Sequence, residues 1–118
     1  MARSVLVVDD DPAFRRLAVR ILTAAGLEVV AEAGTADAAM EAARSLQPAA
    51  VLVDVDLPDR SGIALALELS ALPWRPRILL TSVDFDAARP DDVRRCGANA
   101  FVHKADLPNR SLARLLAA

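Results

Sequence analysis

The sequence predicts an α/β fold in which one sheet of five parallel strands lies between two layers of helices. Short apolar runs rich in valine, leucine and isoleucine alternate five times with segments of helical periodicity. These runs are apolar with little interruption, as expected of strands that helices cover on both faces. At 118 residues the chain has the length of a single domain, and we expect residues 1–118 to fold as one unit.

The first strand and helix are predicted near the N-terminus. Residues 4–8, with the sequence SVLVV, form the first apolar run. Asp11 is placed to cap a helix and Pro12 to begin it, because the first helical turn needs no N–H from proline. Gly26 ends this helix. The predicted buried stripe comprises Phe14, Leu17, Ala18, Ile21, Leu22 and Ala25.

The next two strand–helix pairs follow the same plan. Residues 27–33, LEVVAEA, are the second strand, and a second helix begins after Thr35. Residues 49–53, AAVLV, are the third strand, and residues 61–71 are the third helix. The second helix is expected to bury Ala36, Ala39, Met40, Ala43 and Leu46.

The last two pairs carry weaker patterns. Residues 77–81, RILLT, are the fourth strand, and residues 87–96 form a short helix with few apolar side chains, ended by Gly97. Residues 100–103, AFVH, are the fifth strand, and residues 107–117 are predicted to form a last amphipathic helix. The inward side of that helix is expected to carry Leu112, Leu115 and Leu116.

Composition and charge exclude several classes of protein. Hydrophobic residues make up 54% of the chain but aromatic ones only 3%, so the core is aliphatic. A net charge of −2 gives no general electrostatic reason to bind nucleic acid or an anionic membrane. The N-terminal apolar run is short and ends in acids, unlike a signal peptide or a membrane span. Cys96 is the only cysteine, which rules out an internal disulfide and favours a cytoplasmic location.

Polar side chains follow four of the five predicted strands. They are Asp9 and Asp10 after the first strand, Asp54 after the third, Thr81 and Ser82 after the fourth, and Lys104 after the fifth. The carboxyl ends of parallel strands meet at one edge of the sheet, which is where open α/β folds bind their ligands. The sequence therefore predicts that these side chains line one pocket.

The residue types in this pocket suit phosphoryl transfer. Three carboxylates brought together repel one another unless a cation joins them, and an all-oxygen set suits Mg²⁺. A carboxylate can also act as a nucleophile and form an aspartyl-phosphate. A metal ion and a lysine would neutralise the phosphoryl oxygens, and a hydroxyl would donate a hydrogen bond to one of them.

These residues resemble the receiver domain of two-component response regulators, and the resemblance covers essentially the whole chain. The family's acidic pair stands in VLVVDDDP, its phosphoacceptor aspartate in VLVDVDLPDRSG, its hydroxyl in ILLTS and its lysine in AFVHKAD. In chain order the matching residues are Asp9, Asp10, Asp54, Pro58, Gly62, Thr81, Phe101 and Lys104. The resemblance implies a flavodoxin-like three-layer sandwich with strand order 2-1-3-4-5.

The resemblance also implies a role for each site residue. Asp54 would be the phosphoacceptor, and Thr81 and Lys104 would assist the transfer. The ligands of Mg²⁺ would be the carboxylates of Asp10 and Asp54, a water held by Asp9, and the backbone carbonyl of Asp56.

A phosphoryl group can act at a distance only by favouring one of two existing conformations. The hydroxyl of Thr81 can turn toward a phosphoryl oxygen, and Phe101 on the neighbouring strand is large enough to fill the vacated space. We therefore expect these two switch residues to move together and to reshape the face formed by the fourth helix, the fifth strand and the fifth helix.

The chain departs from the family pattern at three positions. Ala105 replaces the proline that often follows the lysine, so we expect a trans peptide bond there. Ser82 stands where a smaller residue is common, and Asp56 adds an acid beside the site. His103 is expected to be an exposed side chain at a strand end rather than a ligand.

The resemblance implies several partners. A histidine kinase, a phosphotransfer protein or a small acyl phosphate would supply the phosphoryl group, and an output domain or target protein would receive the signal. A homodimer through the switch face or through the first and fifth helices is a further expectation, whereas direct contact with nucleic acid or a membrane is not expected. The chain is either a stand-alone receiver or a piece of a longer regulator, and an end at its last helix favours a piece.

Two other functions stay open as alternatives. The segment VLVDVDLP also resembles the D-x-D motif of haloacid-dehalogenase-type phosphohydrolases, with LLTS and Lys104 in place of their later hydroxyl and lysine. Those enzymes carry the motif after their first strand and usually need a cap. We therefore expect no enzyme activity beyond Mg²⁺-dependent self-phosphorylation from a donor and autodephosphorylation. The third function is an interaction module that works without phosphorylation, and the complete set of site residues argues against it.

Overall fold

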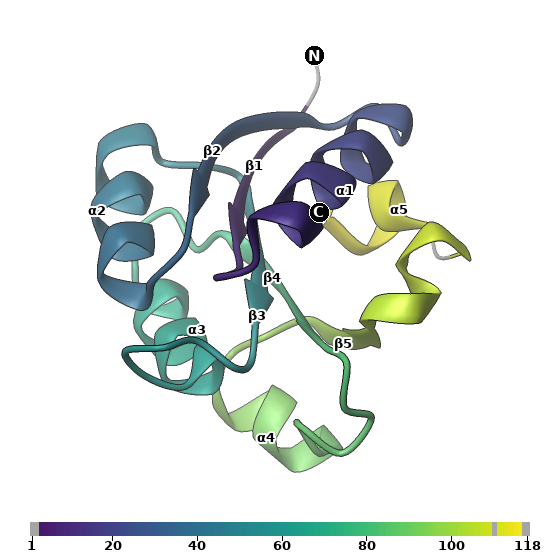
Figure 1. Cartoon of the computed structure of the whole chain (residues 1–118). Helices are drawn as coiled ribbons and strands as arrows, with labels where there is room; N and C mark the ends of the chain where they lie inside the picture. The colour runs from purple at the N-terminus through teal and green to yellow at the C-terminus, as the bar shows by residue number, and fades with distance from the viewer. Residues whose placement is uncertain (1–2, 110, 117–118) are drawn as a thin grey trace.

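The computed structural model of the protein describes residues 3–109 and 111–116. Five parallel strands form one sheet in the order β2-β1-β3-β4-β5 (Figure 1), which confirms the predicted fold class and strand order. The strands are β1 (Ser4–Val8), β2 (Glu28–Ala33), β3 (Ala50–Asp54), β4 (Arg77–Ser82) and β5 (Ala100–His103).

Helices cover both faces of this sheet. The α-helices are α1 (Pro12–Ala24), α2 (Ala36–Leu46), α3 (Gly62–Ser70), α4 (Pro90–Arg95) and α5 (Leu112–Leu116), and a 3₁₀ helix spans Lys104–Asn109. Figure 1 shows α1 and α5 on one side of the sheet and α2, α3 and α4 on the other. No helix of the described residues is long and apolar enough to cross a membrane.

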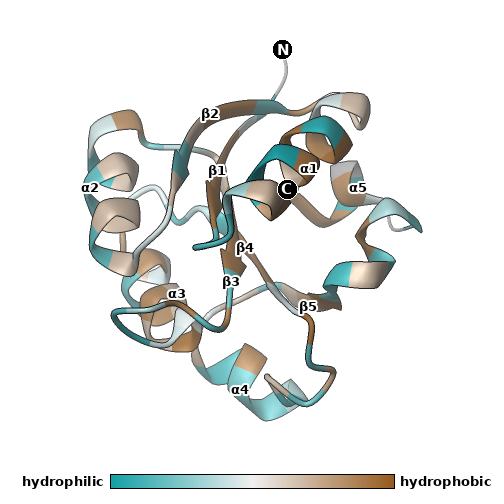
Figure 2. Cartoon of the chain, viewed as in Figure 1, coloured by the Kyte–Doolittle hydropathy of each residue, from teal (hydrophilic) through white to brown (hydrophobic). Residues whose placement is uncertain are grey.

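Each central strand contributes to two hydrophobic cores. Val5 and Val7 of β1 pack toward α1 and α5, whereas Leu6 and Val8 pack toward α2 and α3. This division follows from the strand geometry, in which successive side chains point to opposite faces. Full burial of one such side chain is worth about 1.5–3 kcal/mol. The strands β1 and β4 are accordingly mainly brown in Figure 2, while α4 is mainly teal.

The predicted helix starts are fixed by side-chain caps. The Asp11 carboxylate accepts a hydrogen bond from the Ala13 N–H at 2.9 Å, and the Thr35 hydroxyl accepts one from the Ala38 N–H at 3.1 Å. The Gly26 backbone takes a φ of +86° just after α1, a conformation that favours glycine.

The ends of two helices differ from the sequence-based prediction. The helix α4 begins at Pro90 rather than at residue 87, because the Asp92 carboxylate accepts a hydrogen bond from the Arg89 N–H and sets the start there. The last helix was predicted from residue 107, but α5 begins only at Leu112. Pro108 lies within the 3₁₀ helix that precedes it, and the predicted end at residue 117 lies outside the described residues.

Two leucines predicted to be buried lie near the surface. Leu17 of α1 is 48% exposed, and Leu46 in the last turn of α2 is 50% exposed. Both lie at the margin of an apolar stripe whose buried centre consists of Ala18 and Leu22 in α1 and of Ala36, Ala39, Met40 and Ala43 in α2.

Candidate functional site

The strand register brings the predicted site residues to one edge of the sheet. Val8 of β1 pairs with Val53 of β3, so that Asp9 and Asp54 follow at neighbouring strand ends. Asp54 pairs in turn with Thr81 of β4. These pairings confirm that residues from distant parts of the sequence meet at the carboxyl edge.

Three carboxylates form an acidic cluster at this edge of the sheet. Asp9, Asp10 and Asp54 each offer a carboxylate oxygen, and these atoms lie within 4.8 Å of one another. Asp9 and Asp54 are buried, at 1% and 4% exposure, and Asp10 is exposed. The cluster holds only oxygen donors, which fits a hard divalent cation such as Mg²⁺.

The electrostatics of Asp54 also fit a cation. Burial raises its pKa from 3.8 to about 6, and the neighbouring charge of Asp9 adds to this rise. The hydrogen bond that the Asp56 N–H donates to Asp54 Oδ1, at 3.2 Å, opposes it. A divalent ion at the cluster would remove the repulsion and favour the charged carboxylate.

Lys104 supplies a positive charge beside Asp9 and Asp54. Its Nζ atom lies 2.6 Å from Asp9 Oδ2 and 3.6 Å from Asp54 Oδ2, and its side chain is 14% exposed. Burial alone would lower the pKa of Lys104, but the hydrogen bond to Asp9 and the charge of Asp54 outweigh it and raise the pKa above its usual value. The Nζ atom also lies 4.2 Å from the centre of the Phe14 ring.

Thr81 carries a hydroxyl without a partner. The residue is fully buried, and its Oγ1 atom has no hydrogen-bond partner among the described residues. Buried polar groups are nearly always hydrogen-bonded, so such a group calls for an explanation. Its pairing with Asp54 places it beside the predicted phosphoacceptor.

Two of the departures from the family pattern contact each other. Ser82 Oγ donates a hydrogen bond to Asp56 Oδ2 at 3.3 Å and accepts one from the Asp84 N–H at 3.0 Å. Asp56 is exposed and Ser82 is buried. The extra acid is thus tied to the end of β4 instead of pointing freely into solvent.

The start of α3 lies so close to the end of β3 that residue 62 has to be a glycine. A Cβ atom at this position would lie 2.1 Å from the Asp54 carbonyl oxygen, closer than any real contact. The Gly62 N–H donates a hydrogen bond to the Val55 carbonyl at 2.7 Å. Only glycine allows α3 to begin so close to the end of β3.

The sequence reasoning missed two residues that anchor the loop after β3. Asp59 accepts hydrogen bonds from the Ala36 N–H at 2.8 Å and the Asp37 N–H at 3.0 Å, so it caps α2 from a distance. The hydrogen bond from the Ala36 N–H, and after it the one from the Asp37 N–H, lower the pKa of Asp59. No local pattern could have revealed this cap, because its partners lie more than 20 residues away.

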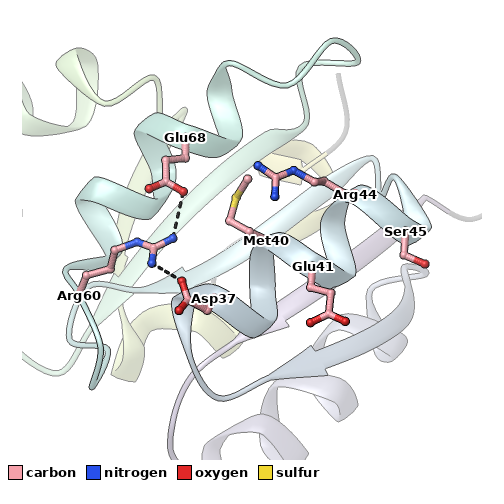
Figure 3. A pocket seen from close by; sticks show the side chains of 7 residues that line it. All are labelled: Asp37, Met40, Glu41, Arg44, Ser45, Arg60 and Glu68. Carbon is pink, nitrogen blue, oxygen red and sulfur yellow. Dashed lines mark hydrogen bonds and ion pairs between the residues drawn. The ribbon is translucent and has the colours of Figure 1, made fainter.

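Arg60 adds a second anchor. It donates hydrogen bonds to Asp37 of α2 and, at 3.0 Å, to Glu68 of α3. Figure 3 shows this bridge at one end of a groove of about 550 Å³ between the two helices. The groove is lined by Asp37, Met40, Glu41, Arg44, Ser45, Arg60 and Glu68, and none of the predicted site residues belongs to it.

The two switch candidates lie on neighbouring strands. Phe101 of β5 is half-buried and lines a hollow of about 340 Å³ together with Ala88, Pro90, Val93 and Arg94. Its strand partner is Leu80, the residue before Thr81. The hollow offers room beside the ring, and the coupled movement of Thr81 and Phe101 stays a prediction.

The side chain of His103 makes more contacts than an exposed side chain at a strand end was expected to make. Its Nε2 atom lies 2.6 Å from the Val83 carbonyl oxygen, and Nδ1 accepts a hydrogen bond from the Ala105 N–H at 3.1 Å. Its ring stacks on Phe85 at 3.8 Å between centres. The half-buried side chain therefore ties the loop after β4 to the end of β5. The described residues contain no cis peptide bond, in agreement with the expectation for Ala105.

The fold and the site together define a class of protein. A five-stranded parallel sheet that places acids, a lysine and a threonine at its carboxyl edge suits the binding of a metal ion and a phosphoryl group there. The family model described as the response regulator receiver domain matches residues 5–115. The chain belongs to this family, whose members are regulatory domains of two-component signalling, typically with Mg²⁺ and a phosphoaspartate.

Curated relatives agree with this assignment. The chain is 31% identical over 110 residues to the chemotaxis protein CheY of Thermotoga maritima, covering 93% of this chain and 92% of that protein. It is 35% identical over 101 residues to a protein-glutamate methylesterase/protein-glutamine glutaminase of Alkalilimnicola ehrlichii, covering 84% of this chain. The chain spans only 26% of that methylesterase.

A solved structure agrees as well. The two-component response regulator of the LuxR family from Aurantimonas superposes with a TM-score of 0.82 at 27% sequence identity. The match covers 98% of this chain and 86% of that one. Receiver domains of this family act with histidine kinases and with output domains.

Proposed function

We propose that the chain is a phosphorylation-dependent switch in which Asp54 accepts a phosphoryl group in the presence of Mg²⁺. The observation that carries this proposal is the setting of the Asp54 carboxylate. It is buried, lies within 4.8 Å of two further carboxylates, and faces the Lys104 ammonium at 3.6 Å. No role in packing requires this combination of charges at a strand end.

The transfer is a displacement at phosphorus. One oxygen of Asp54 attacks the phosphorus atom, the bond to the donor atom breaks, and the donor atom keeps the electron pair of that bond. The donor is the phosphohistidine of a kinase or phosphotransfer protein, or a small acyl phosphate. Lys104 and the hydroxyl of Thr81 stabilise the charge on the transferring oxygens.

Four residues would hold the metal ion. The side chains of Asp9, Asp10 and Asp54 and the backbone carbonyl of Asp56 are the ligands we propose, with Asp9 acting through water. The bound ion would neutralise charge on the phosphoryl oxygens. The aspartates supply this site, and their mutual repulsion is the reason that phosphorylation requires the ion.

The signal leaves through the face of α4, β5 and α5. The unpartnered hydroxyl of Thr81 supports this route, because a phosphoryl oxygen at Asp54 would give it a hydrogen-bond acceptor. Phe101 then moves into the space that Thr81 vacates. An output domain or a target protein, or a second copy of the chain at this face or at α1 and α5, would sense the change. In this proposal residues 1–118 act as one receiver unit.

Intact-mass measurement with acetyl phosphate tests the proposed phosphoacceptor. The protein should gain one phosphoryl group with Mg²⁺ and none with excess EDTA, and Asp54→Asn should gain none under either condition. Asp86→Asn, which changes an exposed acid of the loop after β4, is the matched control and should behave like the parent.

Two results would contradict the proposal. An Asp54→Asn variant that still gains the group would show that another residue is the acceptor. Repeated turnover of a generic phosphate ester by the parent would instead favour the phosphohydrolase alternative.

A further inference from the structure

Lys104 contacts three groups that come from three different elements. Its ammonium meets Asp9 Oδ2 at 2.6 Å after β1, Asp54 Oδ2 at 3.6 Å at the end of β3, and the Phe14 ring of α1 at 4.2 Å. A lysine ammonium has three N–H donors. The ammonium therefore has one close carboxylate partner, with a second carboxylate and an aromatic face as further neighbours.

The aromatic contact lies in a setting where it is strong. The face of a phenylalanine ring carries partial negative charge and attracts a cation, most of all when water is largely excluded. The Lys104 side chain is only 14% exposed, and Phe14 is partly buried against the core beneath α1. The ring thus occupies a side of the ammonium where water would otherwise bind.

The start of α1 determines the position of the Phe14 ring. Asp11 caps α1 and Pro12 begins it, so Phe14 falls in the first turn of the helix, directly after the segment that carries Asp9. Lysine has a long and flexible stem that readily extends into water. A fixed ring over the ammonium opposes that movement.

We propose that Phe14 is a positioning residue that holds the Lys104 ammonium beside Asp54, ready to meet the phosphoryl oxygens. This inference rests on the proposed function and adds to it a residue outside the set predicted from the sequence. Without the ring, Lys104 keeps its ion pair with Asp9 but spends more of its time turned toward solvent, and phosphorylation slows.

A graded change at Phe14 tests the electrostatic contact. Phenylalanine carrying one, two or three ring fluorines is introduced at this position alone, because fluorine weakens the negative ring face with little change in size. The rate of phosphorylation by acetyl phosphate should fall stepwise, by about 2- to 10-fold with three fluorines. Ring fluorination of Trp74, whose N–H donates to the Pro48 carbonyl at 3.0 Å in a loop at the opposite edge of the sheet, is the control and should leave the rate unchanged.

An NMR measurement on the unphosphorylated protein gives a second readout. The ε-methylene protons of Lys104 should be shifted upfield by the ring current of Phe14. Phe14→Leu should return them to ordinary values and slow phosphorylation, and Phe14→Tyr should keep both the shift and the rate near those of the parent. If Phe14 had only a structural role, the Lys104 signals would not change in Phe14→Leu while staying the same in Phe14→Tyr.

The outcomes separate this inference from the proposed function. Equal rates across the fluorinated series, or the same Lys104 shift in the parent and Phe14→Leu, would overturn the positioning role. A parent protein that takes no phosphoryl group contradicts the proposed function, while the Lys104 shift still supports or overturns the contact with Phe14.

Discussion

At the scale of single residues, the unpaired hydroxyl of Thr81 is the feature that a phosphoryl group could change. Its hydroxyl is fully buried and has no hydrogen-bond partner among the described residues. A buried polar group in that state costs about 1–3 kcal/mol. In the proposed switch, a phosphoryl oxygen at Asp54 would accept a hydrogen bond from this hydroxyl and remove that cost. We therefore propose that Thr81 favours one conformation when Asp54 carries a phosphoryl group and another when it does not.

Thr81→Val is expected to raise the stability of the unphosphorylated protein. Valine has nearly the same shape and removes the unpaired hydroxyl, so the free energy of unfolding should rise by about 0.5–2 kcal/mol. Urea denaturation measures the change. Thr35→Val is the matched control, because that hydroxyl caps α2 and its loss should lower stability by about 1 kcal/mol. A Thr81→Val variant that loses as much stability as Thr35→Val would show that the hydroxyl has a partner.

At the scale of elements, the two loops beside Asp54 are held differently. The loop after β3 is anchored to α2 by Asp59 and to α2 and α3 by Arg60. The loop after β4 is held by the contacts of His103 with Val83 and Phe85, and α4 beyond it has no buried residue. Switching elements come from the less stable parts of a fold. The loop after β4 and α4 are therefore the elements we expect to move.

Asp59→Ala is expected to release the start of α2. The amides of Ala36 and Asp37 donate to this carboxylate and should exchange with solvent faster in the variant. The Ala38 amide donates to the Thr35 hydroxyl instead and should keep its protection, which makes it an internal control. Hydrogen exchange followed by NMR measures all three amides, and equal protection in parent and variant would contradict the proposed anchor.

The contribution of Asp59 should also depend on pH. Its pKa is lower in the folded protein than the ordinary value of 3.8, so the unfolded chain binds its proton more readily. The stability that Asp59 adds is therefore present above pH 3.8 and is lost as the pH falls through the lowered pKa. The difference in melting temperature between the parent and Asp59→Ala should shrink across that window. A difference that stays constant down to the lowest pH measured would contradict a charged cap.

At the scale of the whole molecule, the order of the strands in the sheet brings the site residues together. Strands β1, β3, β4 and β5 lie side by side, so their carboxyl ends bring acids, a hydroxyl and a lysine into one site. In our proposal, the same sheet connects that site to the face of α4, β5 and α5. We expect a short displacement at the strand ends to alter this surface, on which another protein would dock.

The parts of this design that follow from local patterns could be predicted from the sequence. The strands are mostly apolar, and Asp9, Asp54, Thr81 and Lys104 lie at or next to strand ends, so the alternation of strands and helices sufficed to predict that these residues meet. The Asp59 cap, the contact of Phe14 with Lys104 and the His103 contacts could not be predicted, because their partners are distant in sequence and meet only in the fold. The start of α5 was wrong because the amphipathic pattern extends back over Pro108, where the chain forms a 3₁₀ helix instead.

The most direct test of the account is an NMR comparison with and without beryllofluoride and Mg²⁺, which together mimic a phosphoryl group on Asp54. Signals of Thr81, Phe101 and residues 84–97 should shift in the parent, and they should not shift with Mg²⁺ alone or in Asp54→Asn. Such a result would tie the site to the α4–β5–α5 face through the two switch residues. Shifts that stay within the loops carrying Asp9, Asp10 and Asp54 and leave Phe101 unchanged would contradict the account.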